Sequence, residues 1–94
     1  MTDTAVYSAL ATSILKGQLM VIGPLAVDQA KMVTGITVDS SNTIRITANG
    51  KETLTNLVKQ FEKLFGKASI EVCKEAIKES QVSVADRDLP DILK

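Results

Sequence analysis

The sequence contains no histidine and no tryptophan, only one cysteine, and few aromatic residues of any kind. The lack of histidine excludes Ser-His-Asp and Cys-His catalysis and removes the side chain that binds metals most often. A single cysteine forms no intramolecular disulfide and does not supply the ligands of a structural zinc site. We therefore expect no bound metal, no cofactor and no enzymatic activity.

Neither sign of charge dominates the chain. It carries 11 basic and 11 acidic residues, so its formal net charge is zero, and no region forms a basic stripe. Neutralisation of phosphates by Lys and Arg dominates nucleic-acid affinity, so we expect no nucleic-acid partner. A helix-turn-helix interpretation of residues 54–79 is disfavoured too, because Glu71, Glu75 and Glu79 would face the phosphates.

The N-terminus lacks the basic region of a signal peptide. The most apolar stretch, residues 5–27, is interrupted by Lys16, Gly17 and Pro24. A bilayer span needs roughly 20 mostly apolar residues without such breaks. A lone cysteine is typical of a reducing compartment. The sequence therefore predicts a cytoplasmic protein without a membrane partner.

Two helices are predicted in the first third of the chain. Apolar residues recur at helical spacing after Asp3, a candidate N-cap, and Gly17 marks an end or a kink. Gly23 then breaks the pattern, and proline is favoured at a first helical position. A second helix is expected from about Pro24 to Val33, with Leu25 on its inner face.

Two further helices are predicted in the second half of the chain. Asn49 and Glu52 have the spacing of a capping box at the start of the third helix. Its apolar residues follow one helical face: Leu54, Leu57, Val58, Phe61, Leu64 and Phe65. Gly66 supplies a left-handed stop. The fourth helix is expected from about Lys67 to Glu79, with Cys73 on its inner face.

Between the two helix pairs the apolar period changes from helical to two. Residues 36–38 and 44–48 alternate apolar and polar side chains, and Ser40, Ser41 and Asn42 are turn residues, which predicts a β-hairpin. The expected fold class is α+β: four helices in two helix–Gly–helix pairs with a central β-hairpin in a single domain. Residues 1–80 form the compact part, and residues 81–94 form a looser C-terminal tail.

The stretch LMVIGPLAVDQA, residues 19–30, resembles the helix–Gly-Pro-x-Ala–helix regions found at the C-terminus of bacterial signalling proteins. The stretch LVKQFEKLFGKASIEVCKEA, residues 57–76, is similar in outline, with Lys67 in place of the proline. The resemblance covers two short segments and names no specific family. It implies a signalling or scaffold role and transfers no active-site residue.

The leading functional hypothesis is a non-enzymatic protein-interaction or regulatory module that forms a homodimer. A two-stranded hairpin has two unpaired edges, and such edges pair with partner strands. The predicted association edge consists of Ile36, Val38, Asp39, Ile44, Arg45 and Ile46. Strand pairing is the expected role, with Asp39 and Arg45 setting the register by charge.

Three other interpretations are open at this point. A small apolar ligand could bind between the helices, in a pocket that Met20, Met32, Gly17 and Gly23 line or loosen. Cys73 could be a reactive thiol, although a cysteine on an inner helix face is more often a small hydrophobic residue. Carboxylate chemistry by Asp28 or Glu62 is a third alternative, without a recognisable nucleophile beside it.

Overall fold

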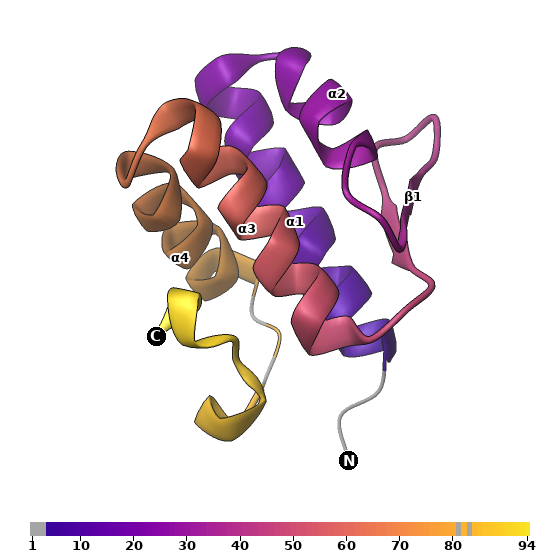
Figure 1. The fold of residues 1–94 in the computed structure, drawn as a ribbon, viewed down its shortest axis with the longest axis vertical. Coiled ribbons are helices and arrows are strands. Elements are labelled where there is room, and N and C mark those ends of the chain that lie inside the picture. Colours follow the sequence, from indigo (N-terminus) through magenta and orange to yellow (C-terminus); the bar gives the residue numbers. More distant parts are fainter. Residues whose placement is uncertain (1–3, 81, 83) are drawn as a thin grey trace.

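The computed structural model describes residues 4–80, 82 and 84–94 (Figure 1). The elements are α1 (Thr4–Ile22), α2 (Leu25–Lys31), β1 (Ile36–Val38), β2 (Ile44–Ile46), α3 (Gly50–Phe65), α4 (Ala68–Ser80) and the 3-10 helices η1 (Asp86–Asp88) and η2 (Asp91–Leu93). Four helices and a two-stranded antiparallel hairpin form one compact unit, which confirms the α+β class. The predicted cap Asp3 lies outside the described residues.

Helix α1 is the central element and contacts α2, α3, α4 and β2. Leu10, Ile14 and Leu15 form its fully buried face. The helix runs on through Gly17, where the sequence predicted an end or a kink. A Cβ on Gly17 would lie 3.1 Å from the Cβ of Ala76, so the missing side chain lets α4 pack closely against α1.

Among the described residues, α1 is the one helix long and apolar enough to cross a membrane, by length and composition alone. Core helices of soluble proteins and signal sequences share this property. In this structure the apolar face of α1 packs against the other helices, and the polar side chain of Gln18 is buried with it. Core packing accounts for part of the apolar composition of α1, while Met20 and Val21 at its C-terminal end are exposed.

The ends of α3 follow the sequence prediction. The side chain of Asn49 accepts a hydrogen bond from the Glu52 amide at 2.9 Å, which confirms the N-cap. Gly66 ends the helix with φ 79°, a backbone angle that glycine adopts without steric cost. Two predicted core residues are corrected: Leu25 is 45% exposed and Leu64 is 48% exposed, because the packed faces of α2 and α3 stop short of them.

The hairpin lies beside α1 with one apolar face against the core. In its antiparallel register Ile36 faces Ile46 and Val38 faces Ile44. Ile44 and Ile46 are buried, and Ile36 and Val38 are partly buried against the same cluster. The predicted alternation of apolar and polar residues is therefore confirmed over 36–38 and 44–46, whereas β2 ends at Ile46 and Ala48, predicted to continue its apolar face, is exposed.

The C-terminal segment, residues 84–94, lies against α4 beside α3 (yellow in Figure 1). Pro90 is fully buried and Leu93 is 6% exposed, so both belong to the packed interior. The Tyr7 hydroxyl donates a hydrogen bond of 2.7 Å to the carbonyl oxygen of Asp88. The described part of the predicted tail is thus docked on the domain.

Candidate association surface

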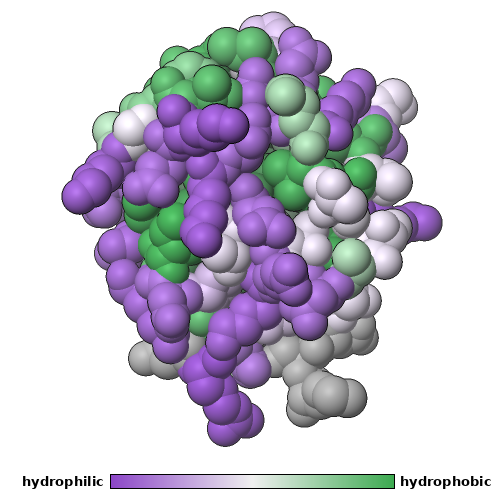
Figure 2. All heavy atoms as spheres, in the orientation of Figure 1, coloured by the Kyte–Doolittle hydropathy of each residue, from purple (hydrophilic) through white to green (hydrophobic). Residues whose placement is uncertain are grey.

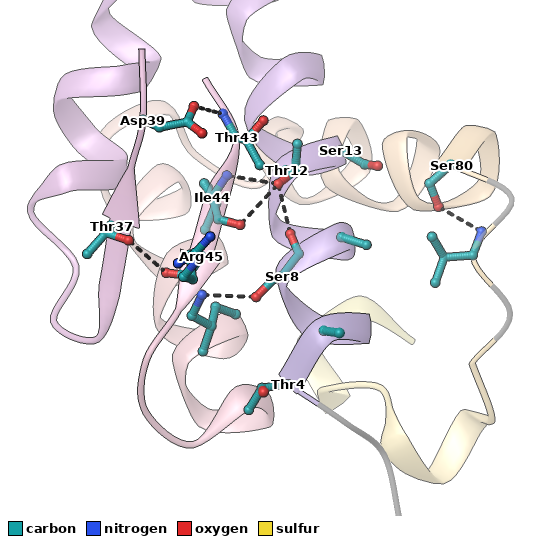
Figure 3. Close-up of a pocket in the computed structure, with 14 residues that line it drawn as sticks. Thr4, Ser8, Thr12, Ser13, Thr37, Asp39, Thr43, Ile44, Arg45 and Ser80 are labelled. Carbon is teal, nitrogen blue, oxygen red and sulfur yellow. Dashed lines mark hydrogen bonds between the residues drawn. The ribbon is translucent and has the colours of Figure 1, made fainter. Parts of the chain in front are cut away.

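The outer edge of β2 is closed by two side chains of α1. The Ile44 amide donates to Thr12 Oγ1 at 2.9 Å, and the Ile46 amide donates to Ser8 Oγ at 2.9 Å (Figure 3). Four helical residues rise about 6 Å, and two strand residues span roughly 6.6 Å. Hydroxyls one turn apart on α1 therefore match alternate amides of β2, and they stand where a third strand would pair.

The outer edge of β1 is not closed by hydrogen bonds among the described residues, although α2 contacts this strand. The Asp39 amide donates to the Thr43 carbonyl at 3.1 Å, and the Thr47 amide donates to the Gly35 carbonyl at 2.8 Å. These bonded pairs alternate with non-bonded ones in an antiparallel ladder, so the amides and carbonyls of Ile36 and Val38 point away from β2. Within the described part of the chain, no hydrogen bond involves these four backbone groups.

The six residues predicted as an association edge thus divide into groups with different roles. The side chains of Ile44 and Ile46 are buried in the core, and their amides donate hydrogen bonds to α1. Ile36 and Val38 present the open edge. Arg45 is exposed on the outer face of the sheet, opposite Thr37, whose hydroxyl lies 3.4 Å from the Arg45 carbonyl oxygen.

The carboxylate of Asp39 organises the turn of the hairpin. Its Oδ1 accepts hydrogen bonds from the Ser41 amide at 2.9 Å, the Ser41 hydroxyl at 2.7 Å and the Thr43 amide at 3.0 Å. The bond from Thr43 and then that from the Ser41 hydroxyl lower the pKa of Asp39, and the charge of Arg45 adds to them. The turn itself is sufficient reason for an aspartate at this position, apart from any role in setting a register.

A shallow depression runs along the exposed face of α1 between the hairpin and the end of α4 (Figure 3). Its volume is about 960 Å³, and its lining is mainly small or hydroxyl-bearing, including Ala9, Ser13 and Thr37. Ser8 and Thr12 also line it, and both are already bonded to β2. Within the described ranges, no group of three or more acidic or cysteine side chains is placed to hold a metal ion.

Cys73 lies in the core between α1 and α4. Its sulfur is fully buried and 3.5 Å from Nε2 of Gln18, which also donates to the Ser69 carbonyl at 3.2 Å. Burial raises the pKa of the Cys73 thiol to about 11, while the Gln18 contact acts in the opposite direction. The thiol is thus neutral at ordinary pH, and a neutral thiol is a poor nucleophile.

Large apolar side chains are exposed near the turn between α1 and α2. Met20 is 90% exposed and Val21 is 62% exposed, and Figure 2 shows apolar surface in green at that end of the molecule. Gly17 and Met20, two of the four residues predicted for a ligand pocket, line an open groove of about 460 Å³ between α1 and α4. Met32 is 69% exposed at the end of α2, and Gly23 has open space beside it.

No protein-family model matches the chain, and no curated protein or solved structure matches it.

Proposed function

We propose that this chain is a non-enzymatic protein-interaction module that forms a homodimer through the outer edge of β1. The observation that carries this proposal is the contrast between the two edges of one hairpin. The β2 edge is closed by Ser8 and Thr12, whereas the amides and carbonyls of Ile36 and Val38 have no partner among the described residues. Open strand edges pair readily with a strand of another chain.

A twofold antiparallel contact satisfies this edge in full. If Thr37 of one copy faces Thr37 of the second, Ile36 faces Val38 of the second copy, and the reverse. Each of these two pairs exchanges two hydrogen bonds. The contact is isologous, as in most homodimers, and it joins two hairpins into one continuous sheet of four strands. The exposed threonines then meet across the axis, where Thr–Thr pairs are favourable.

The expected dimer is weak. Four hydrogen bonds contribute roughly 1 kcal/mol each after exchange with water, and association costs about 4 kcal/mol or more in lost motion. Side-chain contacts beside β1 supply the remainder. The hydrogen bonds and the cost of association about cancel, so the dissociation constant that we expect, on the order of 0.1–1 mM, requires about 4–5.5 kcal/mol from those side-chain contacts.

The test compares two substitutions at one position by light scattering over a concentration series. Val38→Pro removes the outward amide, and proline is tolerated at the outer side of an edge strand. Val38→Ala removes more side-chain volume but keeps the amide, so it is the matched control. We expect the wild type and Val38→Ala to approach twice the chain mass at high concentration, and Val38→Pro to remain monomeric.

A folded Val38→Pro chain that dimerises as well as Val38→Ala would contradict the proposal. Ile44 is unsuitable for this test, because a proline there would remove the hydrogen bond to Thr12 inside the monomer. Circular dichroism on each variant establishes that the fold is intact.

A further inference from the structure

The C-terminal segment has the contacts of a bound peptide. Two side chains, Pro90 and Leu93, are buried in the domain, while Asp91 between them is exposed. In addition to these two buried side chains, two side chains of the helices form hydrogen bonds with the backbone of the segment. The Tyr7 hydroxyl donates to the Asp88 carbonyl at 2.7 Å, and Lys51 Nζ donates to the Arg87 carbonyl at 2.9 Å. Backbone bonds combined with apolar anchors are a recurring mode of peptide recognition.

The receiving surface is built by residues outside the segment. Tyr7 belongs to α1, Lys51 belongs to α3, and η2 packs against both α3 and α4. A Cβ on Gly50 would overlap the ring of Tyr7, so the glycine lets that ring lie against the first turn of α3. The ring position in turn directs the hydroxyl at the Asp88 carbonyl. The surface is therefore organised by the helices themselves.

The segment is held by side-chain packing, to which Val84, Leu89 and Ile92 also contribute, and by few backbone hydrogen bonds to the helices. An open depression of about 720 Å³ runs along it, lined by Thr55 and Lys59 of α3 on one side and by Ile92 on the other. Its regular structure consists of two 3-10 helices of three residues each. Segments without a long helix or a paired strand belong to the parts of a fold that open locally before the core does.

We propose that this surface is a peptide-docking site that accepts the C-terminal segment of a second copy in exchange for its own. The ligand is an aliphatic peptide in which a proline precedes a leucine by three positions, as Pro90 precedes Leu93. We assign a second copy as the partner because its C-terminal segment is identical to the segment that this surface binds in the structure. Exchange of an identical element is a low-cost route to a dimer. The site is separate from the β1 edge, so this inference does not rest on the proposed function.

The test is cross-linking between full-length chains with a short bismaleimide reagent. Lys51 Nζ contacts the Arg87 carbonyl and both residues are exposed, so a cysteine at each position lies within reach of the reagent when a segment is docked. One chain carries Lys51→Cys and the other carries Arg87→Cys, and the two are mixed with the reagent. The matched control replaces the first chain with Lys67→Cys, at an exposed position away from the segment. Buried Cys73 is retained in all chains.

We expect the Lys51→Cys and Arg87→Cys pair to form a covalent heterodimer at least tenfold faster than the control pair. Adding Leu93→Asp to the Arg87→Cys chain removes an apolar anchor and should lower the cross-linking rate to that of the control pair. If the Leu93→Asp chain does not fold, Leu93→Ala replaces it and should also lower the rate. Adding Val38→Pro to both chains should leave the rate unchanged, which separates exchange from pairing at β1. A rate equal to that of the control pair would overturn the proposal.

Discussion

Cys73 shows at the scale of one residue how burial decides chemistry. The same thiol on an exposed helix face would be a candidate nucleophile, but here it is enclosed between α1 and α4 beside Gln18. The sequence predicted its inward position from helical spacing alone. It did not predict Gln18 as its neighbour, because a glutamine in an apolar helix gives no indication of which carbonyl it will meet across the core.

The raised pKa of Cys73 predicts that the folding stability of the chain depends on pH in the alkaline range. The thiol ionises near pH 9 when exposed and near pH 11 in the folded chain, so the unfolded state loses its proton first. Stability is therefore unaffected below about pH 9 and falls as the pH rises towards 11, by about 2 kcal/mol from this group. Urea denaturation of the wild type and of Cys73→Ala across pH 8–11 isolates the effect. Parallel curves for the two proteins would contradict it.

At the scale of elements, the junction of α1 and β2 depends on two hydroxyls. Thr12→Val keeps the shape of the side chain and leaves the Ile44 amide without its acceptor. We expect a loss of about 1–2 kcal/mol in the free energy of unfolding, measured by urea denaturation. Ser13→Ala is the matched control, since the Ser13 hydroxyl forms no hydrogen bond with a described residue, and it should change stability by less than about 0.5 kcal/mol.

An equal loss for Thr12→Val and Ser13→Ala would show that the hydroxyl of Thr12 does not support the strand. Increased self-association of Thr12→Val would have a different meaning. It would indicate that freeing the β2 edge creates a second pairing edge, which is the behaviour that Ser8 and Thr12 prevent in this account.

The helices and the hairpin were largely predictable because their signals are local. The capping residue Asn49 and the apolar spacing of α3 need only neighbours in sequence, and so does the period of two in the strands. The difference between the hairpin edges was not predictable, because it depends on Ser8 and Thr12 from a distant helix. Their spacing of four residues on one helical face is the one signal in the sequence, and it is common on solvated helices.

At the scale of the whole molecule, two surfaces are proposed as contact sites for a second copy. One is the open β1 edge, and the other is the docking surface filled by residues 84–94. The docking surface could not be predicted from the sequence, because the C-terminal segment has no apolar period. Its anchors Pro90 and Leu93 are buried only through tertiary packing against α3 and α4. Both proposed contacts lie outside the buried core of the domain.

The central claim is that β1, and not β2, is the pairing edge. The most direct measurement is a concentration series of two-dimensional ¹⁵N–¹H NMR spectra of the wild-type chain. We predict that the amides of Ile36 and Val38 shift downfield and gain protection from hydrogen exchange as concentration rises. The amides of Ile44 and Ile46, already bonded to Thr12 and Ser8, should stay unchanged. Shifts confined to other residues, or none up to about 1 mM, would contradict the account.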